Sequence, residues 1–130
     1  MEKLRTWTVE IPYKFAGLND YTFACRGNKF SGASMKKQTQ KAIIPYLKKL
    51  PDFKNPIAID FTWVEANARR DPDNVAFAKK FILDTLVALG KIPNDNMKYI
   101  KGFTDRFCIS EKKDYRVEIT IREVEDDGEP

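Results

Sequence analysis

Three aspartates in two short polar segments are the residues of this chain best suited to catalysis. Asp71 and Asp73 lie in the run Arg69-Arg70-Asp71-Pro72-Asp73-Asn74, and Asp95 lies in Asn94-Asp95-Asn96. The sequence has no histidine, which excludes Ser-His, Cys-His and His-metal mechanisms. Carboxylate oxygens, water and phosphate oxygens are the ligands that Mg²⁺ prefers. The three acids therefore predict a magnesium site that faces a phosphate backbone.

The local sequence around Pro72 allows two interpretations of the first two acids. Proline disfavours the α conformation in the residue before it, so Asp71 is expected to be extended. In an extended dipeptide, residues i and i+2 point the same way, and Asp71 and Asp73 can present two carboxylates to one cation. The alternative is an ordinary helix start, with Asp71 as N-cap, Pro72 at the first helical position and Asp73 in the first turn.

Asp95 follows the other end of the same expected helix, about 22 Å away along the helix axis. It can approach Asp71 only if the chain runs back along the helix or if a partner subunit supplies it. The alternative for Asn94-Asp95-Asn96 is a simple turn.

Several basic residues are candidates for contacts with a phosphate backbone. Lys80 lies two helical turns after Asp73, so it can approach the acids and stabilise developing charge. Its alternative role is a surface pair with Asp84 at i+4, and Lys79 is the weaker catalytic candidate. The other predicted DNA contacts are Arg26, Lys29, Lys36, Lys37, Arg69, Arg70 and Lys79. The first four alternate with Tyr21, Phe23 and Phe30, which favours either backbone tracking with base stacking or a solvated face over an aromatic cluster.

Composition predicts one globular domain. The chain has 130 residues, of which 42% are hydrophobic and 32% charged, and no apolar run approaches the roughly 20 residues of a membrane span. The net charge is +4, with 23 basic and 19 acidic residues. Five of the acids lie in the segment 123–130, so we expect a basic domain over 1–122 and an acidic tail over 123–130. Such a body favours anionic partners. Cys25 and Cys108 are expected to be free thiols in a reducing cytoplasm.

Hydrophobic periodicity predicts an α+β fold with a mixed, mostly antiparallel sheet and two main helices. We expect a loop over 13–34, helices over 33–50 and from Asp71 or Asp73 to Leu89, and a hairpin turn at Lys112-Lys113-Asp114. The second helix is apolar on more than one side, and a dimer partner is one candidate to cover it. Strands are expected over 6–12, 57–65, 99–110 and 115–124.

An ordered series of motifs resembles the RusA-type Holliday-junction resolvases, especially the versions carried by phages and prophages of Gram-positive bacteria. The resemblance covers most of the chain. It consists of Gly17-Leu18-Asn19-Asp20, Ala24 to Lys29, Gly32 to Lys37, Asp71-Pro72-Asp73-Asn74, Lys79 to Leu86, Gly90, Asn94-Asp95-Asn96, Ile100 to Phe103 and the strand Tyr115 to Ile121.

This resemblance implies a homodimer that resolves four-way DNA junctions in a bacterial cytoplasm, with Mg²⁺, or Mn²⁺ as a substitute, as the cofactor. The family's essential acids fall on Asp71, Asp73 and Asp95. Its catalytic lysine follows the two-acid motif closely; here Phe77 occupies the nearest place, and Lys80 matches when one helical turn is inserted. Arg69-Arg70 stands where some members carry aromatics. Two other functions stay open: a DNA- or protein-binding module that no longer cleaves, and a general nuclease.

Overall fold

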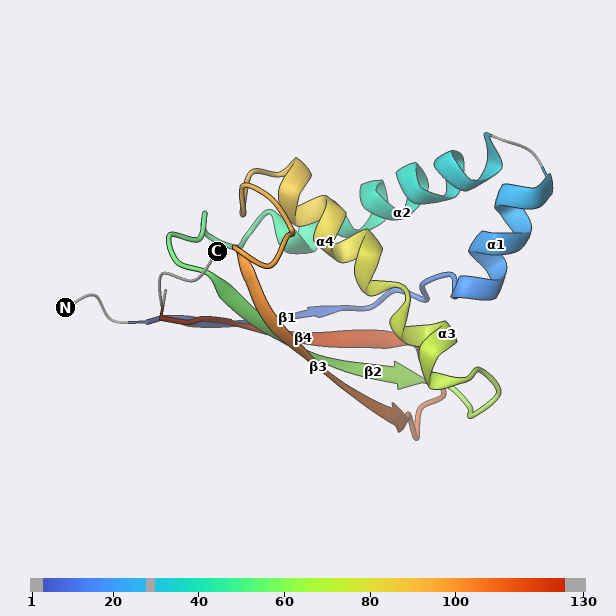
Figure 1. Ribbon diagram of the computed structural model, residues 1–130. Helices are drawn as coiled ribbons and strands as arrows, with labels where there is room; N and C mark the ends of the chain where they lie inside the picture. The colour runs from blue at the N-terminus through green and yellow to red at the C-terminus, as the bar shows by residue number, and fades with distance from the viewer. Residues whose placement is uncertain (1–3, 28–29, 126–130) are drawn as a thin grey trace.

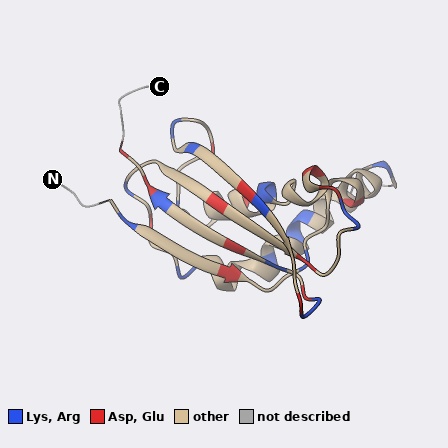
Figure 2. Cartoon of the chain, turned by 90° about the horizontal axis from the view of Figure 1, so that it is seen from below, with Lys and Arg blue, Asp and Glu red and all other residues tan. Residues whose placement is uncertain are grey.

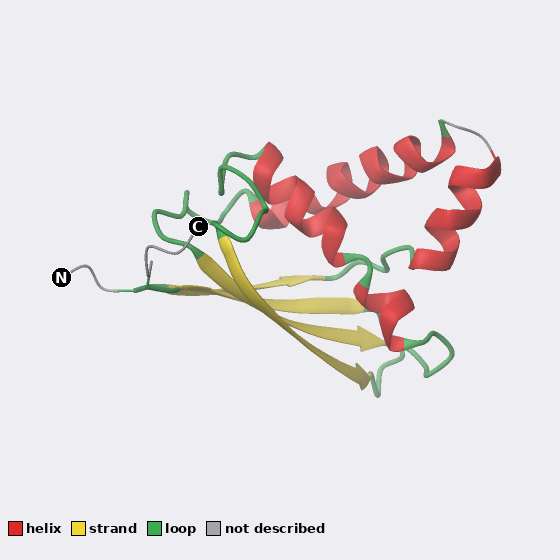
Figure 3. Ribbon diagram, viewed as in Figure 1, coloured by secondary structure: helices red, strands yellow, loops and turns green. Residues whose placement is uncertain are grey.

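A four-stranded mixed sheet, covered by helices on one face, forms the chain (Figures 1 and 3). The computed structural model describes residues 4–27 and 30–125. This arrangement confirms the predicted α+β class. The elements are β1 (Thr6–Ile11), α1 (Leu18–Gly27), α2 (Ser31–Leu47), β2 (Ile57–Glu65), α3 (Pro72–Ala76), α4 (Lys79–Ala88), β3 (Ile100–Ile109) and β4 (Arg116–Glu123).

The strand order is β1-β4-β2-β3, with β1 and β2 antiparallel to β4 and with β3 parallel to β2. The mostly antiparallel sheet is therefore confirmed, but the hairpin predicted at Lys112-Lys113-Asp114 is wrong. That segment connects β3 to β4, and these two strands lie on opposite sides of β2. The core-facing residues Ile57, Ile59, Phe61 and Trp63 of β2 are large, apolar and at most 2% exposed, which suits a strand with a neighbour on each side.

The core lies between the sheet and the helices. Alternate residues of β2 and β4, such as Phe61 and Ile119, point toward the helices and are at most 1% exposed. Ile43 and Leu47 of α2 and Leu86 of α4 close the core from the other side and are fully buried. The alternation that predicted these strands is thus the pattern of core-facing side chains.

The loop predicted over 13–34 is wrong, because it contains the ten-residue helix α1. Gly17 precedes this helix and Gly27 ends it, so the glycines that suggested a loop mark its boundaries. None of its residues is buried, and a helix without a buried stripe carries no strong periodic signal.

The single helix predicted from Asp71 or Asp73 to Leu89 is interrupted. Helices α3 and α4 are separated by Phe77 and Ala78, where Ala78 N–H bonds to Val75 O at 3.2 Å and Phe81 N–H to Ala78 O at 3.0 Å. These i to i+3 bonds tighten the turn between the two helices. Val75, Ala78 and Phe81 are at most 3% exposed there. The second apolar side of α4 is covered by α2 of the same chain, whose Lys36 Nζ lies 2.9 Å from Asp84 Oδ2.

The open face of the sheet carries charges of both signs, as Figure 2 shows. Arg122 Nε lies 3.1 Å from Asp60 Oδ2, and Arg116 Nε lies 3.3 Å from Glu10 Oε1. This face is therefore balanced rather than basic, and a polyanion would gain little from it.

The predicted tail boundary at residue 123 falls inside the sheet. Glu123 is the last residue of β4 and is 4% exposed, with Arg5 Nε 2.9 Å from its Oε1. A paired, buried carboxylate belongs to the folded domain, so the tail begins no earlier than Val124; residues 126–130 lie outside the described part. Among the described helices, none is long and apolar enough to cross a membrane.

The Arg5–Glu123 pair predicts a pH-dependent term in stability. Hydrogen bonding from Arg5 lowers the pKa of Glu123 from 4.5 to about 2. Because the folded pKa is depressed, the stabilisation is present above pH 4.5 and is lost as the pH falls toward 2. Glu123→Gln should lower the free energy of unfolding at pH 7 by about 2 kcal/mol, and this difference from wild type should vanish near pH 2. Urea unfolding at both pH values measures it. The exposed Glu125→Gln is the matched control, and equal stability of Glu123→Gln and wild type at pH 7 would contradict the prediction.

Candidate active site

Asp71 and Asp73 lie at the start of α3, close to the carboxyl end of β2 (Figure 1). Asp71 is extended, with φ −71° and ψ 150°, as expected before proline. Its side chain makes no capping hydrogen bond, although the residue occupies the N-cap position and Pro72 begins the helix. Both acids are exposed. The carboxylate of Asp71 is therefore not used to cap the helix and is available to a ligand from solvent.

A largely buried ion pair fixes the backbone just before these acids. Arg70 Nε and Nη2 donate to the two carboxylate oxygens of Glu65 at 2.8 and 2.9 Å, and Arg70 Nη1 donates to Phe15 O at 2.9 Å. The hydrogen bonds to Glu65 raise the pKa of the Arg70 guanidinium. This fork-to-carboxylate geometry is the strongest form of a side-chain ion pair. Arg70 thus connects β2 and the β1–α1 segment to the acidic turn.

Asn74 anchors the same turn from the other side. Its Oδ1 accepts the Asn19 N–H at 2.9 Å, which connects α3 to the first turn of α1. Gly17 makes this approach possible, because a Cβ at position 17 would lie 2.5 Å from Asn74 Oδ1. The acidic turn is therefore held on both sides, by Arg70 just before Asp71 and by Asn74 just after Asp73.

Lys79 and Lys80 take different directions at the start of α4. Lys79 Nζ lies 2.6 Å from Asp105 Oδ2 on β3, and 4.8 and 5.5 Å from the ring centroids of Phe103 and Phe61. Lys80 is mostly exposed, and its Nζ lies 3.9 Å from Asp84 Oδ2. The i,i+4 alternative for Lys80 is thus present in the structure, but at a long distance and with the ammonium largely in solvent. The break before α4 also removes the continuous helix on which the link from Asp73 to Lys80 was based.

Asp95 lies in the segment between α4 and β3, at the opposite end of α4 from the acidic turn (Figure 1). It is exposed. Across residues 4–27 and 30–125, no group of three or more His, Cys, Asp or Glu side chains gathers closely enough to hold a metal ion. In one chain Asp71 and Asp73 thus share a turn, and Asp95 lies apart from them.

The predicted DNA-contacting residues are spread over two regions. Arg69 is exposed beside the acidic turn, whereas the guanidinium of Arg70 is occupied by Glu65 and Phe15. Arg26 and Lys37 are exposed at the end of the α1–α2 pair, and Lys36 is paired with Asp84. Lys29 lies outside the described residues. Their contacts with DNA stay predictions.

Sequence reasoning missed Glu65 and Asp105 as parts of this region. Glu65 is 9% exposed at the end of β2, and its only sequence signal is a carboxylate at the end of an apolar strand, five residues before an arginine. Asp105 accepts hydrogen bonds from both Trp63 Nε1 at 2.9 Å and Lys79 Nζ at 2.6 Å. Its parallel register with Phe61 depends on strand order, which one sequence does not give.

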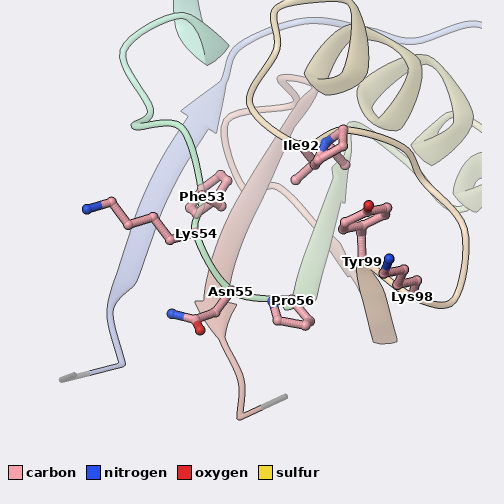
Figure 4. A pocket seen from close by; sticks show the side chains of 8 residues that line it. Phe53, Lys54, Asn55, Pro56, Ile92, Lys98 and Tyr99 are labelled. Carbon is pink, nitrogen blue, oxygen red and sulfur yellow. The ribbon is translucent and has the colours of Figure 1, made fainter. Parts of the chain in front are cut away.

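A small cavity of about 110 Å³ lies at the other end of the molecule (Figure 4). It is formed by the segment before β2 and the segment between α4 and β3, and no predicted site residue lines it. Figure 4 shows Tyr99 and Ile92 at its wall and Lys54 pointing away from it. Since no carboxylate lines this cavity, it offers no second metal site.

No family model matches the chain. A search of curated proteins likewise found no significant match.

The buried Arg70–Glu65 pair predicts a contrast between two adjacent arginines. Arg70→Met should destabilise the fold by about 3 kcal/mol, because it leaves the Glu65 charge buried without a partner. Arg69→Met, at an exposed position, should change stability by less than about 0.5 kcal/mol. Urea unfolding measures both, and hydrogen exchange over residues 71–77 should accelerate only in Arg70→Met. Equal stability of the two variants would show that the pair does not hold the acidic turn.

Proposed function

We propose that this chain is a magnesium-dependent endodeoxyribonuclease that cuts four-way DNA junctions. The observation that carries the proposal is the pair Asp71 and Asp73, two exposed carboxylates on a braced turn, with the side chain of Asp71 unused for capping. The resemblance of the ordered motifs to the RusA-type resolvases supplies the substrate class. The alternative function is a binding module that does not cleave.

The donor set of this turn fits Mg²⁺. This ion takes one or two protein carboxylates, several waters and substrate phosphate oxygens, and Asp71 and Asp73 provide two carboxylates open to solvent. A bound ion of this kind polarises a phosphate and lowers the pKa of a coordinated water. The chain's own contribution is to hold the two acids on a fixed turn that follows the exposed Arg69. Arg69 is suited to a phosphate contact, and Lys80 stays the predicted residue for charge stabilisation.

The third predicted acid favours a dimer. Asp95 precedes β3, whereas Asp71 follows the end of β2, and Ser110 N–H bonds to Glu65 O at 2.8 Å beside the carboxyl ends of both strands. The ten residues of β3 span about 33 Å. Within one chain, Asp95 is therefore near the start of β3 and the acidic pair is near its far end.

Strand β3 offers a surface on which a second copy of the chain could dock and place its Asp95 near the acidic pair of the first. It ends the strand order β1-β4-β2-β3, so among the described strands it pairs on one side alone. It also exposes three large apolar side chains, Phe103 at 42%, Phe107 at 41% and Ile109 at 55%. Unpaired edges with apolar side chains favour association. Antiparallel pairing of two β3 strands about a two-fold axis would carry each Asp95 toward the acidic pair of the other chain.

The proposal predicts the behaviour of Asp73→Asn. The substitution removes a metal ligand and a negative charge that repels phosphate, so cleavage should fall by at least about 100-fold while junction binding is kept or strengthened. The measurement is cleavage of a labelled immobile four-way junction in Mg²⁺, beside the linear duplex of the same sequence and an RNA. Asp52→Asn is the matched control, because Asp52 is highly exposed and lies outside the acidic turn.

The outcomes of this experiment separate the candidate functions. Paired symmetric nicks on the junction alone, lost in Asp73→Asn, support the resolvase. Cutting of duplex or RNA at the same rate indicates a general nuclease. Tight junction binding by wild type without nicks, in Mg²⁺ and Mn²⁺ alike, indicates the non-catalytic module.

The dimer argument predicts complementation between two inactive variants. In a mixed dimer of Asp73→Asn with Asp95→Asn, a site shared between chains is intact on one side and doubly altered on the other. Mixing the two variants should therefore restore nicking of single strands to about a quarter of the wild-type site number, since half of the dimers are mixed and each has one intact site. Each variant alone should be inactive. If the mixture is inactive while its chains exchange, Asp95 does not act across the interface.

A further inference from the structure

The outer surface of α2 carries cations along one stripe. Lys37 and Lys41 of α2 and Lys48, the residue that caps its C-terminal end, are exposed and follow one another at intervals of four and seven residues, which is about 6 and 10 Å at the helical rise. Helix α2 contains no acidic residue. Among the described residues, none of these three lysines forms an ion pair, unlike Lys36 on the side that faces α4. The stripe therefore presents positive charge that the protein itself does not neutralise.

A hollow adjoins this stripe at the end where α1 and α2 meet. It is lined by Ala24 of α1, by Phe30 before α2, and by four residues of α2, Ser31, Ser34, Met35 and Gln38. Ser34 and Gln38 are exposed on the same side of α2 as Lys37 and Lys41. Phe30 is 67% exposed, and Phe23, next to Ala24 in the sequence, is 79% exposed. Apolar surface and hydrogen-bonding groups thus meet beside the lysines.

We propose that the stripe and the hollow form a binding site for single-stranded nucleic acid, in which the lysines contact consecutive phosphates and one unpaired base enters the hollow. A base has an apolar face and a polar edge, and the hollow offers Ala24 and Met35 to the face and Ser31, Ser34 and Gln38 to the edge. The polar character of the stripe makes a membrane surface a poor fit, because interfacial helices insert a large apolar face.

The position of this site relates it to the acidic turn, and in this respect the inference rests on the proposed function. The Asn19–Asn74 hydrogen bond fixes the start of α1 beside α3, and the ten residues of α1 cover about 15 Å to its other end. That span corresponds to about four nucleotides along one strand of B-form DNA. A strand cut at the acidic turn would therefore reach the hollow about four nucleotides from the cut, where a base has to leave its pair to enter the hollow.

The experiment measures binding of a fluorescent twelve-residue thymidine oligonucleotide in EDTA, so that no cleavage contributes. The variant Lys37→Ala/Lys41→Ala/Lys48→Ala should reduce the slope of log K against log salt concentration by about 2, since each phosphate contact in a single strand contributes about 0.7. The control variant Lys14→Ala/Lys98→Ala/Lys112→Ala makes the same change in net charge at exposed positions elsewhere. An unchanged slope in the α2 variant, or an equal reduction in the control, overturns the proposal.

The hollow is tested with an oligonucleotide that carries one 2-aminopurine. Ser34→Leu should fill the hollow, abolish the change in fluorescence on binding and weaken binding about tenfold. Ser34→Ala leaves the hollow open and removes one hydroxyl, so it should keep the fluorescence change and weaken binding less than Ser34→Leu. Competition by poly-glutamate as effective as by the oligonucleotide would show a general anion surface and overturn the proposal. Because these measurements need no metal, a wild-type protein that binds in this way and never cuts a junction rejects the proposed function but not this site. If the wild type cuts junctions but the triple lysine variant and Ser34→Leu bind the oligonucleotide as the wild type does, this site is rejected and the proposed function is not.

Discussion

The position of the acidic turn depends on one charged contact, the pair between Arg70 and Glu65. Both side chains are largely removed from solvent, so each charge is stable there only with the other in place. The pair joins the last residue of β2 to the residue before Asp71, and the bond from Arg70 to Phe15 O adds the segment after β1. A short turn with two like charges would otherwise tend to separate them. The sheet thus holds the acids through an arginine, while among the described residues no hydrogen bond or ion pair uses either carboxylate.

The same principle of balanced charge distinguishes the faces of the molecule. On the open face of the sheet, Arg122 and Arg116 are matched by Asp60, Glu10 and Glu118, and hydrogen bonds from Thr104 and Arg122 lower the pKa of Asp60. On α2, by contrast, the outward lysines have no acidic neighbour on their helix. A polyanion is attracted where charge is unmatched, so the excess of basic residues in the body is effective along α2 rather than across the sheet.

Much of the fold could be predicted from the sequence, because the strands alternate apolar residues that face the core with residues that face outward. The predicted strand over 57–65 agrees with β2, and those near 6–12, 99–110 and 115–124 differ from the observed strands by a residue or two at their ends. Helix α1 was missed because none of its residues is fully buried. The break between α3 and α4 was missed because helical dihedrals continue through it and only the hydrogen-bond spacing changes. The order of strands was beyond local patterns, since placing β2 between β3 and β4 is a property of the assembled core.

Less of the candidate site could be predicted from the sequence. The motif Asp71-Pro72-Asp73 implies an extended first acid, and its backbone has that conformation, because the steric effect of proline is local. The position of Asp95 relative to Asp71 and Asp73 depends on how the strands pair, which no short stretch of sequence specifies. Parallel pairing of β2 and β3 puts the residues before β3 and those after β2 at opposite ends of the sheet, whatever their sequence. A function that needs all three acids at one phosphate therefore requires more than one chain. It also predicts an exposed apolar edge such as β3, because an interface must bury surface that the isolated domain leaves in water.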